Sequence, residues 1–434
     1  MKVLILNQFF HPDLSATAQI AADLAEDLEA DGFEVTALAA RGSYLGGRAL
    51  AARERYRGVE IVRVPTTSFG KRSIIHRAVD YASFYGAATF ELLRMPKQDA
   101  IIALTTPPLI ATAALLVRGL RGTRLVLWVM DVYPEVAVAL GTLRPSSLAA
   151  RAMAAASRIV LSRADHVVVL GEAMRERVIK AGAVPRRVEL IPNWADAHAV
   201  TPIPHEKNPL RSVLAGDARC LVMYSGNMGR GHDMASLLEA ARQLRHRSDI
   251  RFAFLGDGAG RPEVEAAVRE LPNVSVGDYQ ARERLSLSLS AADLHLVSLR
   301  PEHEGLMEPS KLYGIMAAGR PAIFVGPLGS EVARTIVREG CGIVLSGKSP
   351  ADIADSIVAL AEDERTRMAM GARGREALTA RYARPLATSS FARLLRSLFP
   401  SAADGRERDK SVQGPAEDSL RALRQAQSRG SMGR

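Results

Sequence analysis

The 434-residue chain is poor in cysteine and in aromatic residues, and each shortage excludes a class of protein. Its two cysteines, Cys220 and Cys341, both fall in apolar runs typical of buried strands. Neither a disulfide framework nor a zinc site of clustered cysteine and histidine is therefore expected, and we predict no metal. Aromatic residues make up only 5%, and no DNA- or RNA-binding motif is present, so we expect no nucleic-acid partner.

Long apolar runs are also missing. No stretch reaches the roughly 18 uninterrupted apolar residues of a membrane-spanning helix, and the longest candidate, residues 107–117, is ended by Arg118. Residues 1–6 are too short for the apolar region of a signal peptide and predict a first strand instead. These absences favour a cytoplasmic protein.

Positive charge is what the chain has in excess, with a formal net charge of +10 and a pI of about 9.8. Nine basic residues and only two glutamates lie between Arg41 and Arg77. Residues 71–94 then mix apolar and basic residues at helical spacing. Two interpretations stay open: a helix that lies on an anionic bilayer at the inner membrane, or a core helix with a solvated face.

Strand-like apolar runs alternate with helical segments twice along the chain, which predicts an α/β protein with two doubly wound parallel sheets. We expect an N-terminal Rossmann-like domain at 1–195, a linker at 196–212 and a second such domain at 213–380. A last helix within 381–400 should return to the first domain. The tail, 401–434, is polar and predicted to be disordered.

Residues 300–321 form the most informative stretch, because they join two buried-looking strands through a loop and a short helix. Pro309 suits the first positions of that helix, which places Ser310 and Lys311 near its N-terminus, where free N–H groups attract anions. The preceding loop carries three carboxylates: Glu302, Glu304 and Glu308. The pattern predicts a ligand site at the carboxyl ends of the strands.

Two glycine-rich segments follow strands in the second half. Residues 224–233 contain Gly226, Asn227, Gly229 and Arg230 at the opening of a helix, where glycines let the backbone approach phosphates. A second segment is Gly256-Asp257-Gly258. The alternative for both is a tight strand-to-helix turn with no ligand.

In the first half, residues 128–135 place Asp131 and Glu135 at the end of a predicted strand. They are acidic candidates for contact with a hydroxyl group, although Asp131 also suits a helix cap. Ser15 is predicted to cap the first helix.

The run PSKLYGIMAAGRP, at 309–321, resembles the nucleotide-sugar site of retaining glycosyltransferases of family 4, which have the GT-B fold. The subgroup is the one that builds bacterial O-antigen, capsule and exopolysaccharide. Residues 224–233 resemble the family's diphosphate loop, and 128–135 resemble the subgroup's DxWPE segment. The family's usual pair of glutamates would fall at Leu306 and Gly314, so Glu304, Glu308 and Lys311 are its candidate replacements.

The resemblance implies two domains facing each other across a cleft, with the acceptor on the first and the donor on the second. It implies transfer of a hexose or N-acetylhexosamine, with retention, from a nucleoside diphosphate sugar, expected to be a UDP-sugar, to a polyprenol-linked or growing glycan acceptor. It assigns catalysis to Asp131, Glu304, Lys311 and Arg230. It assigns donor binding to Gly226, Asn227, Gly229, Gly256, Asp257, Gly258, Glu308, Ser310 and Leu312.

Two other functions fit parts of the pattern. A GT-B sugar-nucleotide epimerase has the same fold and donor but needs no acceptor. A basic protein that binds nucleic acid or membrane would explain the charge but leaves the glycine-rich segments without a role.

Overall fold

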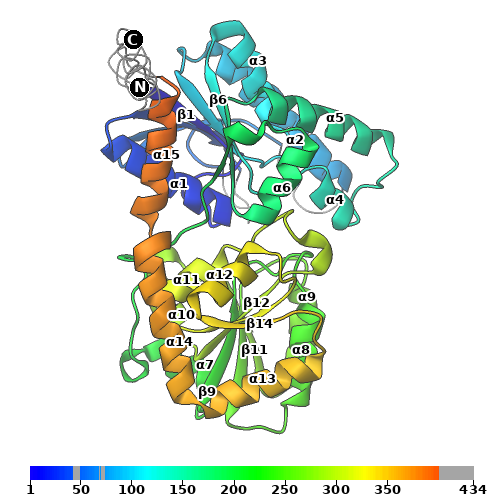
Figure 1. Ribbon diagram of the computed structural model, residues 1–434, viewed down its shortest axis with the longest axis vertical. Helices are drawn as coiled ribbons and strands as arrows, with labels where there is room; N and C mark the ends of the chain where they lie inside the picture. The colour runs from blue at the N-terminus through cyan, green and yellow to red at the C-terminus, as the bar shows by residue number, and fades with distance from the viewer. Residues whose placement is uncertain (43–48, 68, 70–73, 400–434) are drawn as a thin grey trace, which may run out of the picture. The chain divides into compact units, whose positions relative to one another are not determined.

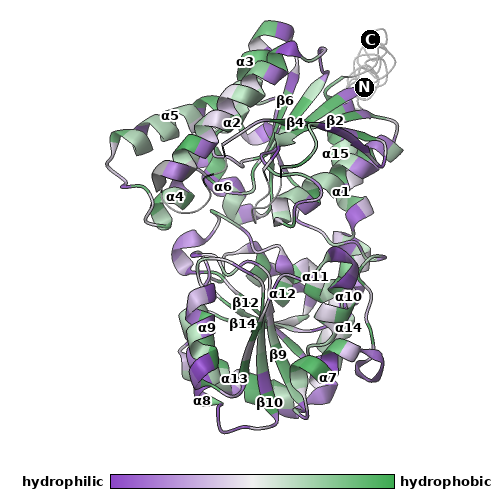
Figure 2. Cartoon of the chain, turned by 180° about the vertical axis from the view of Figure 1, so that it is seen from behind, coloured by the Kyte–Doolittle hydropathy of each residue, from purple (hydrophilic) through white to green (hydrophobic). Residues whose placement is uncertain are grey.

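The computed structural model describes residues 1–42, 49–67, 69 and 74–399. The predicted tail at 401–434 and part of the basic stretch between Arg41 and Arg77 lie outside these residues. The described chain contains an eight-stranded sheet followed by a six-stranded sheet, each covered by helices (Figure 1). Strands and sheet-facing helix surfaces carry mostly hydrophobic residues (Figure 2).

The first sheet has the order β3-β4-β2-β1-β5-β6-β7-β8 and is parallel except for β3. Its strands are β1 (Lys2–Leu6), β2 (Glu34–Ala40), β3 (Arg53–Tyr56), β4 (Val59–Val64), β5 (Ala100–Ala103), β6 (Arg124–Trp128), β7 (His166–Val169) and β8 (Val188–Leu190). The sequence predicted a parallel sheet and did not predict β3. This short edge strand is rich in charge and pairs antiparallel with β4 through a turn at Arg57 and Gly58, so it lacks the apolar pattern of a buried strand.

The helices of the first half are α1 (Ala16–Ala30), α2 (Ile74–Arg94), α3 (Ala111–Arg121), α4 (Glu135–Ala139), α5 (Leu148–Arg163) and α6 (Glu172–Ala181). Ser15 stands at the N-cap of α1, as predicted, but its side chain makes no capping bond. Instead the Asp13 carboxylate accepts a hydrogen bond from the Ser15 backbone N–H at 2.8 Å. In α2, Phe84, Ala88 and Leu92 are buried, so this apolar stripe faces the protein core.

The second sheet is parallel throughout, with the order β11-β10-β9-β12-β13-β14. Its strands are β9 (Cys220–Ser225), β10 (Ile250–Leu255), β11 (Val274–Gly277), β12 (Leu294–Ser298), β13 (Ala322–Val325) and β14 (Gly342–Leu345). Connections leave β9 toward one edge of the sheet and β12 toward the other. The crevice at the carboxyl ends of β9 and β12 is thus the place where such a sheet binds ligands.

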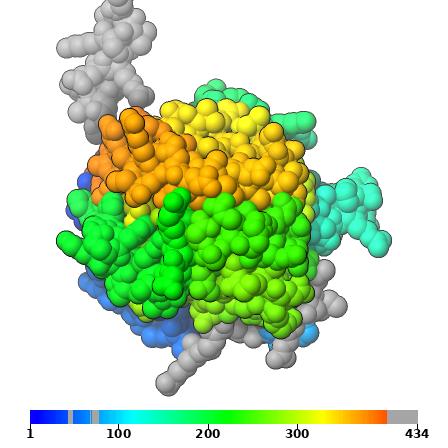
Figure 3. Space-filling view, turned by 90° about the horizontal axis from the view of Figure 1, so that it is seen from below, coloured from blue at the N-terminus to red at the C-terminus, as the bar shows by residue number. Residues whose placement is uncertain are grey.

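Helices α8 (Met234–Gln243), α9 (Arg261–Glu270) and α13 (Pro350–Glu362) pack on one face of this sheet. The other face is covered by α11 (Lys311–Ala317), α12 (Glu331–Glu339) and α14 (Glu364–Ala377). Two shorter helices, α7 (Pro209–Ala215) and α10 (Leu285–Ser290), complete this half. In Figure 3 the orange segment that contains α13 and α14 and the green segment of α7 to α9 form much of the visible surface. Both cysteines are free and buried, as expected.

The last helix, α15 (Arg384–Ser397), begins against the first half of the chain. The Arg384 guanidinium donates to Asp23 at 2.9 Å and to Asp27 at 2.6 Å, both on α1. Thr388 donates to Asp27 at 2.8 Å. Residues 1–390 form one compact unit, and the described residues that follow, 391–399, belong to a second. The two Rossmann-like domains and the returning helix predicted from the sequence are confirmed. Among the described residues, no helix has the length and apolarity to cross a membrane.

Candidate active site

The two glycine-rich segments pack against each other at the carboxyl ends of β9 and β10. Gly226 N–H donates to Leu255 O and Met228 N–H to Asp257 O, each at 2.8 Å. Gly256 and Gly258 both have φ +141°; a Cβ at Gly256 would overlap the Gly226 carbonyl, and one at Gly258 would lie 2.6 Å from the Asn227 side-chain oxygen. Only glycine fits this backbone contact, which leaves an exposed main-chain surface beside Asn227.

The start of α8 is not open to an anion, contrary to the sequence prediction for the first glycine-rich segment. Asp233 is the N-cap of α8, and its carboxylate accepts from Ser236 N–H at 3.2 Å and from the Ser236 hydroxyl at 2.6 Å. The helix start already holds a negative charge. This leaves the glycine-rich loop itself as the candidate place for an anionic ligand.

Lys311 lies directly against this loop. Its Nζ is 3.7 Å from the centroid of the Tyr224 ring and 3.4 Å from Asn227 O. Its Cε is 3.4 Å from the place where a Cβ would stand on Gly226. The surrounding protein removes water from the ammonium group and holds the Lys311 pKa well below its usual range. Burial thus disfavours the charged form of the Lys311 amine in the free protein, and an anion bound beside it would favour that form.

One detail of the α11 prediction is corrected. The helix begins at Lys311 and has seven residues, so Pro309 precedes it, and Ser310 is the N-cap without a side-chain capping bond. The side chain of Leu312, predicted to bind the donor, is fully buried in the core that α11 forms with α12. Arg230 is exposed at the end of the glycine-rich loop.

The loop between β12 and α11 carries two predicted acids. One oxygen of Glu308 accepts from the Glu331 N–H at 3.3 Å, and its other oxygen is buried without a partner. Burial, together with the nearby Glu331 and Glu304 charges, raises the pKa of Glu308 to about 8. Glu308 is therefore largely protonated at neutral pH and can donate a hydrogen bond. Glu304 is half-buried and lies against Gly329, where an added Cβ would overlap its carboxylate.

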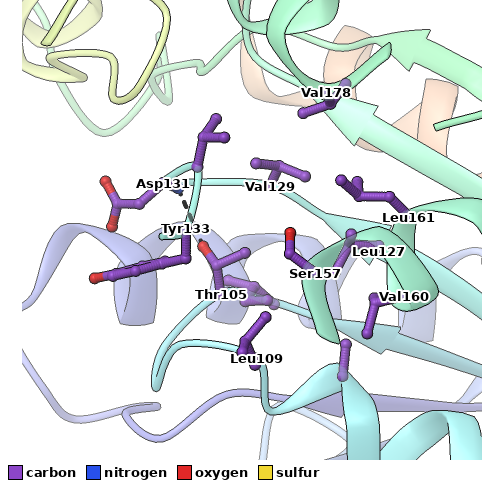
Figure 4. Close-up of a pocket in the computed structure, with 13 residues that line it drawn as sticks. Thr105, Leu109, Leu127, Val129, Asp131, Tyr133, Ser157, Val160, Leu161 and Val178 are labelled. Atoms are coloured by element: carbon purple, nitrogen blue, oxygen red, sulfur yellow. Dashed lines mark hydrogen bonds between the residues drawn. The ribbon is translucent and has the colours of Figure 1, made fainter. Parts of the chain in front are cut away.

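Asp131 is held at the end of β6 by Thr105, whose hydroxyl accepts from the backbone N–H groups of Met130 and Asp131, both at 3.1 Å (Figure 4). Asp131 also forms an antiparallel bridge with Met307, and Val132 N–H donates to Leu306 O at 2.8 Å. These contacts bring Asp131 to the loop that carries Glu304 and Glu308. Helix α4 has Pro134, not Asp131, at its N-cap, so the capping alternative for Asp131 is wrong.

Burial raises the pKa of Asp131 to about 6. Behind it lies a small cavity of about 30 Å³, lined mainly by aliphatic side chains of the first sheet and its helices, among them Leu104, Leu127, Val129, Val160 and Leu161 (Figure 4). In the figure the Asp131 carboxylate points away from these aliphatic groups. Glu135, the other acidic candidate, is half-buried at the first position of α4.

Sequence reasoning missed one polar residue of this region, His303. It is 1% exposed, and neither ring nitrogen has a hydrogen-bond partner. Only its place within residues 300–321 could have drawn attention to it, because a histidine between acidic residues usually lies on the surface. Among the described residues, no group of acids, histidines or cysteines is arranged to hold a metal ion.

Comparisons with known proteins agree on both halves of the chain. Residues 15–194 match the glycosyl transferase 4-like domain, and residues 219–363 match the glycosyl transferases group 1 family. A probable glycosyltransferase of Pseudomonas aeruginosa, WbjE, is 30% identical over 70% of this chain and 76% of its own length. WcaI of Escherichia coli, a putative colanic acid biosynthesis glycosyl transferase, is 28% identical over 77% of this chain and 85% of its own length.

Solved structures show the same fold at low identity. The sucrose-phosphate synthase of Thermosynechococcus elongatus superposes with a TM-score of 0.73 at 17% identity, over 92% of this chain and 99% of that one. WaaG, a glycosyltransferase involved in lipopolysaccharide biosynthesis, has a TM-score of 0.68 at 18% identity, over 89% of this chain and 98% of that one. HepE of Anabaena, solved with UDP and glucose, has a TM-score of 0.69 at 14% identity, over 92% of this chain and 100% of that one.

Proposed function

Since the chain belongs to the glycosyltransferases with a glycosyl transferase 4-like domain and a group 1 domain, and has their GT-B fold, we propose the following reaction. The enzyme transfers a hexose or N-acetylhexosamine from a UDP-sugar to a polyprenol-linked or growing glycan acceptor, with retention at the anomeric carbon. The product is a bacterial surface polysaccharide. The names of WbjE and WcaI support this class of product.

One observation carries the proposal: Lys311 and both glycine-rich loops converge at the carboxyl ends of β9, β10 and β12. Lys311 Nζ sits 3.4 Å from Asn227 O on a main-chain surface that only glycines allow. A cation without a matching anion beside an exposed backbone is a suitable receptor for a diphosphate. Glu308, which is largely protonated at neutral pH, can hydrogen-bond a hydroxyl of the donor sugar.

In the proposed reaction, the bond between the sugar's anomeric carbon and the diphosphate oxygen breaks. The acceptor oxygen bonds to the same face of that carbon, and its proton passes to the leaving diphosphate. Lys311, Arg230 and the loop N–H groups stabilise the charge that develops on the diphosphate. Asp131 orients the acceptor hydroxyl, and Glu304 lies between the acceptor and donor sides. Because fixed cations supply this stabilisation, the proposal needs no metal.

We expect UDP or a UDP-sugar to raise the melting temperature in a thermal-shift panel that also contains GDP- and dTDP-sugars, because a ligand that binds only the folded state stabilises it. Sugar transfer to an acceptor extract should then require the nucleotide that gave the shift. Conversion of the nucleotide sugar without any acceptor would instead identify an epimerase. No shift with any member of the panel would contradict the proposed donor site.

We also propose that the enzyme works at the cytoplasmic face of the inner membrane. The C-terminal part of the predicted apolar stripe of α2 is buried, Val79 is exposed, and the side chains of Ile74, Ile75 and Arg77 lie outside the described residues. Exposed apolar side chains do occur on the adjoining helices α2 and α3: Phe90 is 59% exposed and Leu120 66%. Arg94 lies over the Phe90 ring, and Lys97 and Arg124 are exposed nearby in sequence. This combination suits an anionic bilayer.

The double substitution Phe90→Glu with Leu120→Glu should lower binding to vesicles that contain anionic phospholipid by about tenfold, because each exchange removes apolar contact and adds repulsion. Cosedimentation at low and high salt measures this, and wild-type binding should weaken as salt rises. Val213→Glu with Val337→Glu, at exposed apolar positions of the second half, is the matched control. Equal binding of all three proteins would contradict the proposed face.

A further inference from the structure

His303 is a buried polar residue without a partner inside the proposed donor site. It ends a short 3₁₀ turn, Pro301–His303, between β12 and α11. Its backbone is fully engaged, since its N–H donates to Arg300 O at 3.0 Å and its carbonyl accepts from Leu306 N–H at 2.9 Å. Its ring is different: both nitrogens are buried and neither makes a hydrogen bond. A buried N–H without a hydrogen bond has a substantial free-energy cost, so the simplest explanation is that the ring pairs with a ligand.

The ring lies against the end of the first glycine-rich loop. Its Cδ2 is 3.5 Å from the place where a Cβ would stand on Gly231. The same glycine is tied to the His303 loop, because its carbonyl accepts from Arg300 N–H at 2.9 Å. The ring therefore lies at the buried end of the first glycine-rich loop, beside the Met307 side chain.

The ring of His303 is neutral at the pH where the enzyme works. Burial lowers the His303 pKa; the Glu302 charge opposes this, and the Arg300 charge adds to it. Burial also lowers the pKa of the neighbouring His232 to about 3, with smaller contributions from Lys311 and His303, so His232 lies between the lysine and His303. A neutral imidazole offers one N–H donor to a negative oxygen.

We propose that His303 is a donor-binding residue whose ring N–H donates to an oxygen of the nucleoside diphosphate. This rests on the proposed function and adds a recognition group to its site. Binding requires a small shift of the loop 303–308. That loop also contacts the first domain through Leu306 and Met307, so donor binding and the position of Asp131 are linked.

The test is calorimetric titration of the full chain with UDP, with pyrophosphate and with uridine. His303→Phe should weaken UDP and pyrophosphate binding by about tenfold, the effect of losing one charge-assisted hydrogen bond, and leave uridine binding unchanged. His303→Gln keeps an N–H donor and should bind UDP within about threefold of wild type. The exposed His246→Phe is the matched control.

Stability separates a ligand contact from a structural role. Because the ring makes no hydrogen bond in the free protein, His303→Phe should keep or raise the melting temperature while it weakens binding. A lower melting temperature in His303→Phe with unchanged UDP affinity would assign a packing role and overturn the inference. Equal affinity of both His303 variants for UDP would overturn it as well. Failure of wild type to bind any nucleoside diphosphate would instead contradict the proposed function.

Discussion

Replacement of Lys311 by methionine is expected to lower kcat/KM for sugar transfer by about 100-fold or more, the effect of removing one fixed donor from a developing charge. The ammonium lies 3.7 Å from the Tyr224 ring centroid and 3.4 Å from Asn227 O, and neither contact supplies a full negative charge. In the proposed complex, the bound diphosphate supplies that charge. Methionine keeps the shape of the side chain but cannot stabilise the leaving group.

The same substitution should stabilise the donor-free protein. Folding lowers the pKa of Lys311 from its ordinary 10.5, so the unfolded chain binds more protons between the two pKa values. The free-energy cost that the buried Lys311 imposes on folding is therefore complete below the folded-state pKa, and it disappears as the pH rises toward 10.5. The gain in melting temperature of Lys311→Met should be larger at pH 7 than at high pH.

Kinetics with saturating acceptor and melting curves at several pH values measure both effects. Lys348→Met, at an exposed position, should change neither quantity. Lys311→Arg should keep part of the activity, because the charge remains while its geometry changes. Wild-type turnover in Lys311→Met would remove the basis for the diphosphate site.

Conversion of Asp131 to asparagine is expected to lower kcat by about 30- to 100-fold, at or below the lower end of the range for a general acid or base, because Asp131 orients the acceptor hydroxyl and does not take its proton. Thr105 fixes the backbone at Asp131, and the bridge to Met307 brings it to the donor loop, so the amide would take the same place without the charge.

The pH profile gives a second test of Asp131. With a pKa raised to about 6, its carboxylate form is lost as pH falls through that value. Wild-type kcat should therefore fall about tenfold per pH unit below the pKa, while Asp131→Asn should lack this acidic limb. The exposed Asp217→Asn serves as control. An acidic limb that persists unchanged in Asp131→Asn would assign the ionisation to another group.

Both predictions assign the electrostatic interactions with the substrates to side chains that the fold holds in place, one from each half of the chain. Lys311 follows β12, and Asp131 follows β6. The bridge from Asp131 to Met307 and the hydrogen bond from Val132 to Leu306 join the two sites through the main chain. Because main-chain contacts do not depend on side-chain identity, they would survive substitution of either charged residue. The two variants can therefore be compared within the same framework.

Local patterns in the sequence were sufficient for the two parallel sheets, the returning helix and the region of the site. Apolar runs of strand length separated by helical segments allow few other folds. The glycines at 226, 256 and 258 are visible because a close backbone contact admits no other residue. Lys311 stood out because a proline, a serine and a lysine followed a loop of carboxylates between two buried strands.

Tertiary contacts decided the rest, because they join residues that no local pattern relates. Asp233 caps the start of α8, which the sequence predicted to be open to phosphate. The Leu312 side chain is buried in the core because α11 packs against α12. The pairing of Asp131 with Met307 spans the two domains. His303 became notable only through its burial without a partner. The sequence by itself determined the fold and which residue types stand at the proposed site. Only the three-dimensional packing decided which polar groups lack a partner and therefore remain available to a ligand.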